Sequence, residues 1–550
     1  MPGQEPRLRV FTEQTLRVCA PLAELAVGNP CSPSRNEDVA RVLGAEYVEP
    51  SATVAPGLDP RVKGGNIAAM KRLVRKLLPV LQERYKAGGE VSDVERRIYI
   101  RVVYHYLEGA SAVRLQEIVD RTSADSDKRA RAAHFYPEFA AAYEYYLGFL
   151  GKAPDVLPCV RLFEVLFQAR RAFFALYTKI RGRSAPVERL RAAIWNALFA
   201  GPLDDYGLHR WNRMHKLPVL IQGPTGTGKE LVAETLAMSG YVPFDATEGE
   251  LSFARYDHYY AGINLVAFAP GVLPSELYGH VKGAFTGAVK DKVGILESVP
   301  EFGAVLLDEI AEIPLEMQAE LLRVLQERRF RAVGEEKESR KLAARVLCAT
   351  HRDMALLMHE GHVREDFYRR VRMLKLTVPS LRERFDALPD ELRDLTAFIA
   401  ADLFGPENAE TLVEQVETVV RTKLRRHPWT GNMRELAQCV AEVQTTGTYV
   451  PERPDPAVAL AIALRNVRVP LDDVRRRYAE IAVEKAGNPT AAARLLGVDT
   501  RTVKALLKDE PEPTLLRAPP SKRMPASMRS LPSSRPGPSS KRAPSSKQKG

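Results

Sequence analysis

Between Ile67 and about residue 180, apolar positions recur every three to four residues and are separated by lysines and arginines. This spacing is typical of amphipathic helices, and the aromatic residues that share it are typical of a packed core, although an aromatic ligand box is the alternative. We therefore predict a mainly helical N-terminal regulatory region over residues 1–180, of unknown fold. The apolar and aromatic positions include Met70, Leu73, Val74, Leu77, Leu78, Leu81, Phe135, Phe139, Tyr143, Tyr146 and Phe149.

After Ser184 the pattern changes to short apolar runs that alternate with helical segments. The runs are PVLIQG at 218–223, GAVLLDE at 303–309 and ARVLCAT at 344–350. Alternation of this kind is typical of α/β folds with a parallel sheet. We predict an α/β subdomain over residues 184–385.

Four further segments complete the predicted organisation of the chain. A helical segment spans 386–447, and a proline-bearing linker over 448–467 separates it from a small all-α unit at 468–509. Residues 510–550 are rich in Pro, Ser, Lys and Arg and contain too few apolar residues to fold, so we expect a disordered tail.

Composition narrows the class of protein. With 550 residues, 45% hydrophobic and 27% charged, the chain is typical of multidomain globular proteins. No apolar run approaches the roughly 18 residues that a membrane span needs, and the first residues do not form a signal-peptide core, so we expect a cytoplasmic protein without membrane contact.

Charge and cysteine content exclude other classes. The formal charge is +11, but the tail after Leu516 carries nine basic residues and no acid, which leaves about +2 for the rest of the chain. The basic pI is therefore weak support for nucleic-acid binding by the folded part. The five cysteines are scattered without a CxxC pair, which favours reduced thiols over a disulfide framework or a structural zinc site.

A glycine-rich segment, GPTGTGKE, lies between an apolar strand and a predicted helix. Such glycines let backbone N–H groups surround phosphates, while the lysine reaches the β and γ oxygens; an ordinary glycine turn is the alternative. A Ser or Thr, which would supply a magnesium ligand, usually follows the lysine, whereas this chain has glutamate. The predicted nucleotide-binding residues are Gly223, Pro224, Thr225, Gly226, Thr227, Gly228, Lys229 and Glu230.

Two acidic residues end the apolar strand that lies some 80 residues downstream. Asp308 and Glu309 have the chemistry needed to hold Mg²⁺ and to polarise an attacking water, although a solvated acidic turn is the alternative. Together with the glycine loop they indicate a nucleoside triphosphatase. We expect Asp308 to act through the metal and Glu309 as the catalytic base.

Six motifs in order carry a family resemblance: GPTGTGKE, SELYGHVKGAFTGA, GAVLLDEIAEIP, VREDFYRRV, LRER and HPWTGNMREL. Over residues 184–447 the chain resembles the AAA+ domain of bacterial enhancer-binding proteins, which activate sigma-54 RNA polymerase. The resemblance implies an AAA+ P-loop ATPase core, with residues 386–447 as its helical lid, and implies ATP and Mg²⁺ as cofactors. Glutamate is usual after the loop lysine in that family, which accounts for Glu230.

The most specific motif is GAFTGA, an uncharged hexapeptide with glycines on either side of Phe285 and Thr286. Such a sequence suits a mobile loop that presents one apolar group and one hydroxyl. The resemblance implies that this loop contacts sigma-54 and moves as ATP is hydrolysed. The implied contact residues are Gly283, Ala284, Phe285, Thr286, Gly287 and Ala288.

Three arginines match family positions. Arg364 and Arg370 match arginines that are presented to the ATP of a neighbouring subunit, which makes a homo-oligomer, expected to be a hexameric ring, a catalytic requirement. Arg369 adjoins Arg370, and a shared role stays open. Arg434 matches the sensor arginine of the lid.

The chain departs from the family pattern in two places. His351 stands where the family usually has asparagine, and it can hydrogen-bond but can also become charged. About twenty extra residues precede Asn264, whose position matches an asparagine that pairs with the catalytic glutamate.

Residues 468–509 end in two predicted short helices joined by a glycine turn at Gly497, with N-caps at Asn488 and Asp499. They resemble the helix-turn-helix of Fis-type domains, which implies binding to double-stranded DNA; a plain helical hairpin is the alternative. The residues expected to face the DNA are Thr500, Arg501, Thr502, Lys504 and Lys508.

The sequence therefore predicts an ATP-driven transcription activator that binds upstream DNA and opens promoters held by sigma-54 RNA polymerase holoenzyme. Two alternatives stay open. One is a DNA-binding regulator with a vestigial ATPase, which His351 favours. The other is an AAA+ remodeller of a different protein target.

Overall fold

The computed structural model describes residues 9–49, 65–124, 132–252, 259–337, 340–424, 427–451, 460, 464 and 471–508. The chain divides into two compact units, Met1–Tyr449 and Val450–Gly550. The predicted tail after residue 508 and most of the predicted linker lie outside the described residues. Across the described ranges, no helix combines the length and the apolar character needed to cross a membrane.

The first unit is built around a parallel five-stranded sheet with the order β11-β1-β10-β7-β4. The residues of its central strands are almost all apolar, because both faces of the sheet are covered by other elements. The carboxyl ends of β1, β7 and β10 meet at one edge, which brings together the glycine loop and the acidic pair. The strands are β1 (Val219–Gln222), β4 (Tyr260–Asn264), β7 (Ala304–Asp308), β10 (Arg345–Thr350) and β11 (Leu374–Thr377).

The two faces of the sheet belong to different cores. Leu220, Val305 and Cys348 pack in a cluster with α13 (Leu315–Glu327) and α15 (Glu365–Val371). The same cluster takes residues from α11 (Leu273–Tyr278), α12 (Ile295–Ser298) and α14 (Met354–His359). Two hairpins complete this part of the chain, that of β5 (Gly279–His280) and β6 (Lys292–Val293) and that of β8 (Arg329–Phe330) and β9 (Arg340–Lys341). The helix α9 (Lys229–Met238) packs in the other cluster. The prediction of an α/β core with a parallel sheet is confirmed.

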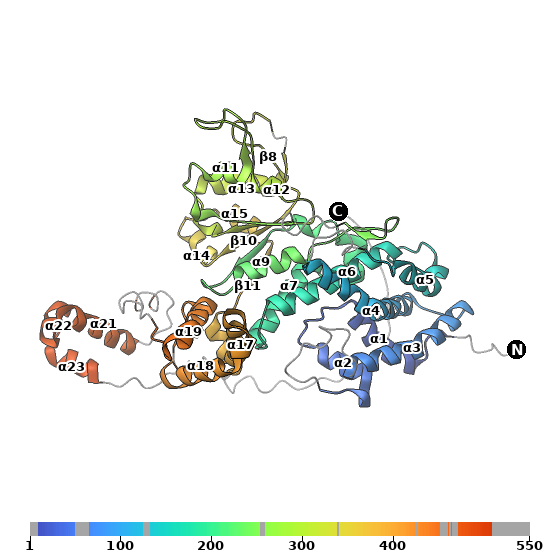
Figure 1. The fold of residues 1–550 in the computed structure, drawn as a ribbon, viewed down its shortest axis with the longest axis horizontal. Coiled ribbons are helices and arrows are strands. Elements are labelled where there is room, and N and C mark those ends of the chain that lie inside the picture. Colours follow the sequence, from blue (N-terminus) through green and yellow to red (C-terminus); the bar gives the residue numbers. More distant parts are fainter. Residues whose placement is uncertain are drawn as a thin grey trace, which may run out of the picture. The chain divides into compact units, whose positions relative to one another are not determined.

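The alternate strand positions, among them Val219 and Ile221, share one continuous core with the N-terminal helices. Figure 1 shows α6 and α7 beside α9 and the sheet. The predicted helical character of this region is confirmed, and the region packs directly onto the five-stranded sheet. Its helices are α1 (Glu13–Val27), α2 (Arg35–Leu43), α3 (Gly65–Lys86), α4 (Asp93–Ala124), α5 (Tyr136–Leu147) and α6 (Cys159–Lys179). They are followed by α7 (Ala185–Phe199) and α8 (Leu203–Asp205), which precede β1.

The segment of extra residues after α9 docks on α6. It contains the hairpin of β2 (Phe244–Asp245) and β3 (Glu250–Leu251). The buried carboxylate of Glu164 accepts hydrogen bonds from the backbone N–H of Phe244, at 2.8 Å, and from the hydroxyl of Tyr241. Burial raises the pKa of Glu164, while Arg161 lies 2.8 Å from its carboxylate. The insertion therefore ties the N-terminal helices to the α/β core.

Four helices form the lid: α16 (Leu381–Ala387), α17 (Glu391–Phe404), α18 (Ala409–Lys423) and α19 (Asn432–Thr446). Their core contains Trp429 and Leu436. Arg384 pairs with the fully buried Glu391 at 2.8 Å and donates to the carbonyl of Arg181, which attaches the lid to the end of the N-terminal region.

The second unit contains α21 (Leu471–Ala486), α22 (Pro489–Leu496) and α23 (Thr500–Lys508). The cap predicted at Asn488 is confirmed, since its side chain accepts a hydrogen bond from Ala491 N–H. Gly497 ends α22 with a φ of 67°, and the Asp499 carboxylate accepts from Arg501 N–H at 2.7 Å. Ala492, Ala493 and Val503 are buried between the helices.

Candidate functional site

The glycine loop runs from the end of β1 to the first residue of α9. Gly226 and Gly228 have φ values of 76° and 93°, a conformation that strains any side chain. The buried hydroxyl of Thr227 donates to the carbonyl of Pro224. The ammonium of Lys229 donates to the carbonyls of Gly223, at 3.1 Å, and of Pro224. The loop therefore has the geometry in which backbone N–H groups can surround an anion.

Asn432, the first residue of α19, joins the lid to this loop and was missed by the sequence reasoning. Its amide donates to the carbonyl of Thr225 at 2.9 Å, and its side-chain oxygen accepts from Leu381 N–H at 2.8 Å. The next residue, Met433, donates its N–H to the carbonyl of Gly226. Asn432 has a φ of 55°, which asparagine tolerates better than most residues. The glycine-asparagine pair in HPWTGNMREL was the available signal.

The acidic pair lies at the end of β7. Glu309 has a φ of 55°, a left-handed conformation unusual for glutamate, and its N–H donates to the Asp308 carboxylate at 3.0 Å. Such strain in a non-glycine residue is concentrated at functional sites. Burial and the adjacent charge of Glu309 raise the pKa of Asp308, whereas burial lowers the pKa of Lys229.

These electrostatics fit a divalent cation. Burial and the neighbouring charge of Glu309 both disfavour the ionised form of the Asp308 carboxyl, and a cation bound beside it would stabilise that form. Lys229 is its main cationic neighbour. Within the described ranges, no cluster of three His, Cys, Asp or Glu residues could hold a metal by itself. Mg²⁺ at Asp308 would therefore need phosphate oxygens and water as its other ligands, which is its usual mode of binding beside nucleotides.

His351 contacts the glutamate that the sequence identified as the base. Its Nδ1 lies 2.8 Å from Glu309 Oε2, and its side chain is 40% exposed. Asn264 lies beside Asp308 in the β4–β7 register, but its side chain accepts from Val266 N–H. Among the hydrogen bonds of the described residues, Glu309 is therefore paired with His351, and pairing of Asn264 with Glu309 stays a prediction.

The candidate arginines lie on or next to α15. Arg364 forms a two-pronged ion pair with Asp366, at 2.8 and 3.1 Å. Arg370 donates to the carbonyl of Leu325, and Arg369 pairs with Glu365 on the exposed surface. In the part of the chain that the structure describes, neither Arg364 nor Arg370 bonds to the glycine loop. Arg434 lies close enough to Lys229 to lower its pKa.

The GAFTGA segment forms the turn between β5 and β6. Gly283 and Gly287 have φ values of 84° and 101°, and Gly283 N–H donates to the carbonyl of Ala288 at 2.8 Å. Phe285 is 47% exposed, and its ring makes an edge contact with His280. The turn thus presents a large apolar side chain to solvent.

In the second unit, Arg501, Thr502 and Lys504 are exposed on α23, and Thr500 is half-buried at its start. The side chain of Lys508 lies outside the described residues. Val503, between Thr502 and Lys504 in the chain, is buried and faces the other helices of the unit.

Comparison with known proteins confirms the resemblance. Residues 208–377 match the sigma-54 interaction domain. The response regulator protein PilR of Pseudomonas aeruginosa is 32% identical over 304 residues, which cover 53% of this chain and 64% of PilR. The transcriptional regulatory protein ZraR of Salmonella typhimurium is 36% identical over 302 residues, covering 52% and 62%. The chain thus spans a little under two thirds of the length of these relatives.

A solved structure, that of NtrX from Brucella abortus in complex with ATP, aligns with 68% of this chain and 75% of its own. At a TM-score of 0.35 and 22% identity, this likeness is too low to bear on function.

Proposed function

We propose, from the sigma-54 interaction domain that this chain contains, that the protein is an ATP-dependent activator of sigma-54 RNA polymerase. It binds upstream double-stranded DNA through residues 468–509, assembles into a hexamer, and converts the closed promoter complex to the open one. The observation that carries the proposal is the exposed Phe285 on a turn between two strands, in the same unit as a phosphate-binding loop.

In this proposal the glycine loop and Lys229 bind the phosphates of ATP, with Asp308 holding Mg²⁺. Magnesium supplies charge neutralisation at the phosphates. Glu309 orients and deprotonates the attacking water, and its left-handed backbone fixes the carboxylate beside Asp308. His351 holds that carboxylate until nucleotide binds. Arg364 and Arg370 leave their present partners to reach the ATP of a neighbouring subunit.

The chain path supports coupling between hydrolysis and the GAFTGA turn. The turn is followed by β6 and α12, and α12 leads directly into β7, which ends at Asp308. Val281, just after β5, donates its N–H to the carbonyl of Val333, which lies in the connection between β8 and β9. A change at the acidic pair therefore has a short route to Phe285.

For DNA binding, the exposed polar side chains at the start of α23 support a helix that enters the major groove. Most of the lysine and arginine contacts would be to phosphate, with one or two side chains reading base edges. The domain boundaries follow the same proposal: regulatory region 1–180, α/β ATPase 184–385, lid 386–447, linker 448–467 and DNA-binding unit 468–509.

The test is open-complex formation by the full-length protein with sigma-54 holoenzyme on supercoiled DNA, comparing wild type with Glu309→Gln. The matched control is Glu316→Gln, an exposed glutamate on α13. We expect opening that needs ATP, is lost in Glu309→Gln and persists in Glu316→Gln.

The contact between His351 and Glu309 favours one alternative, a DNA-binding regulator with a vestigial ATPase. Absence of ATP hydrolysis in the wild type and in His351→Asn would support that alternative. Hydrolysis without opening would favour a remodeller of another protein target.

A further inference from the structure

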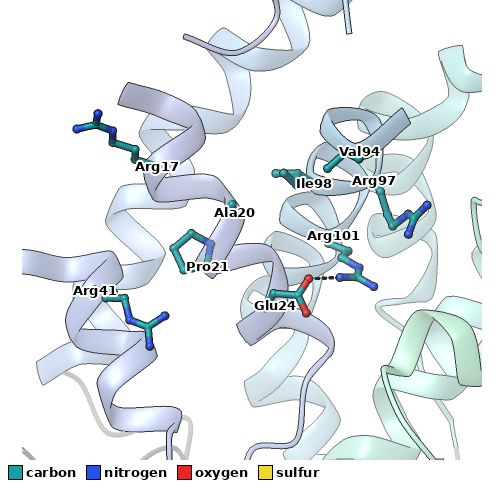
Figure 2. Close-up of a pocket in the computed structure, with 9 residues that line it drawn as sticks. All are labelled: Arg17, Ala20, Pro21, Glu24, Arg41, Val94, Arg97, Ile98 and Arg101. Carbon is teal, nitrogen blue, oxygen red and sulfur yellow. Dashed lines mark hydrogen bonds and ion pairs between the residues drawn. The ribbon is translucent and has the colours of Figure 1, made fainter. Parts of the chain in front are cut away.

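The N-terminal region contains a hollow of about 510 Å³ between α1, α2 and α4. Figure 2 shows Ala20 and Pro21 of α1 in its middle, with Arg41 on one side and α4 on the other. The hollow exists because these two side chains are small compared with the arginines around them. Its volume is within the range of small-molecule sites in proteins.

Four of the lining residues are arginines, whereas Glu24 is the one acid among them. Arg17 pairs with Glu13, and Arg41 pairs with Asp38, each within one turn of its own helix. Exposed pairs of this kind are weak, so both guanidinium groups can turn toward an anion at little cost. Arg97 is exposed, and the described residues record no hydrogen bond or ion pair for it.

Arg101 differs from the other three because it is held in place. Its side chain is 12% exposed, and its Nε donates to Asp204 Oδ2 at 2.7 Å. Its Nη1 pairs with the carboxylate of Glu24, whose side chain is 69% exposed. Glu24 therefore occupies the solvent side of a fixed guanidinium at the edge of the hollow, where a carboxylate from another molecule would fit equally well.

Asp204 links this pair to the ATPase core. It lies in α8, in the segment that leads into β1 and the glycine loop. The same guanidinium thus touches α1 through Glu24 and the entrance to β1 through Asp204. Replacement of Glu24 by another partner of Arg101 would therefore change the contacts of α1 and of the segment that leads into β1.

We propose that this hollow binds a small molecule that carries a carboxylate or phosphate on an apolar body, and that its anionic group takes the place of Glu24 on Arg101. The planar fork of arginine matches both anions, and several arginines from different helices would hold the group from two sides. Pro21, Ala20 and Ile98 would contact the apolar part. The idea that the bound molecule acts as an inducer depends on the proposed function. The idea that the hollow binds such a molecule does not.

The experiment uses the full-length protein and the fluorescent probe 8-anilinonaphthalene-1-sulfonate, which joins an anionic group to an apolar body. Octanoate and inorganic phosphate serve as competitors, one amphipathic and one without an apolar part. The variants are the double substitution Arg41→Gln with Arg97→Gln, the single substitution Glu24→Gln, and Arg75→Gln as control. Arg75 is an exposed arginine on α3, away from the hollow.

We expect the double variant to bind the probe at least about fivefold more weakly, since two charged contacts are lost. Glu24→Gln should bind it about two- to threefold more tightly, because the competing carboxylate is gone. Arg75→Gln should match wild type, and octanoate should displace the probe at lower concentration than phosphate does.

Unchanged affinity in the double variant, or weaker binding in Glu24→Gln, would overturn the proposal. Thermal melts followed by circular dichroism check that each variant is folded. Because the readout needs neither ATP hydrolysis nor a promoter, failure of this site is distinguishable from failure of the proposed function.

Discussion

Replacing Glu164 by alanine should release the insertion hairpin from the N-terminal helices. The carboxylate is 6% exposed and accepts from Phe244 N–H and the Tyr241 hydroxyl, both of which are buried. Each buried donor left without a partner costs about 1–3 kcal/mol. Arg161 loses its ion pair but keeps its stacking on Trp211, at 3.4 Å from the ring centre.

The loss should therefore total about 3–5 kcal/mol, in the range measured for broken buried pairs. Since about 1.4 kcal/mol is a factor of ten, backbone amides of the β2–β3 hairpin should exchange with solvent roughly 100- to 4,000-fold faster. Hydrogen exchange followed by mass spectrometry measures this directly. Glu164→Gln keeps one acceptor oxygen and should cost about 1–2 kcal/mol.

The pH dependence has a definite sign. Because burial raises the folded-state pKa of Glu164, the folded state binds the proton more tightly than the unfolded chain does. This contribution to stability is present at low pH and declines as the pH rises through the raised pKa, and it is absent in Glu164→Gln. The control is Glu138→Ala, which removes an exposed ion pair with Arg114 and should cost under about 1 kcal/mol. Equal exchange rates in Glu164→Ala and Glu138→Ala would refute the reasoning.

Four further outcomes are expected. Phe285→Ala should keep ATP turnover within about twofold and lose promoter opening, whereas Val289→Ala, an exposed neighbour on the same hairpin, should keep both; turnover and permanganate footprinting measure the two activities. The Mg²⁺ concentration that gives half-maximal turnover should rise as the pH drops toward the raised pKa of Asp308, because the metal and a proton compete for the same carboxylate; a half-maximal concentration that stays constant down to about pH 4, the range of an ordinary aspartate, would contradict this. Asn432→Gly should lower the stability of the lid by about 2–3 kcal/mol through lost hydrogen bonds, and Asn432→Ala by about 1 kcal/mol more because of its positive φ, as read from urea unfolding of the ATP-free protein. Burial raises the pKa of the thiols of Cys19, Cys348 and Cys439 to about 12, so titration with a chromogenic disulfide at pH 8 should detect these thiols only after addition of guanidinium chloride.

The sequence allowed the phosphate-binding loop and the acidic pair to be predicted because each depends on a short motif at the end of a strand. Asn432 was missed because its role arises from the approach of the lid to Thr225, more than 200 residues away in the chain. The contact between His351 and Glu309 joins residues from different strands, and the family pattern pointed instead to Asn264. The docking of the insertion depends on a buried glutamate 80 residues upstream, which no local pattern indicates.

The shared core changes how control by the N-terminal region should be examined. Val219 and Ile221 of β1 pack in the same cluster as Leu166, Phe167 and other residues of α6. Deleting residues 1–180 would expose these strand positions and the carbonyls of Ser239 and Gly240, to which Gln168 and Arg171 donate. If the truncated protein is inactive, the cause could therefore be unfolding of the α/β core as readily as removal of the regulatory region. Substitutions on the surface of the region, such as those at Arg41 and Arg97, leave this core covered and so separate regulation from folding.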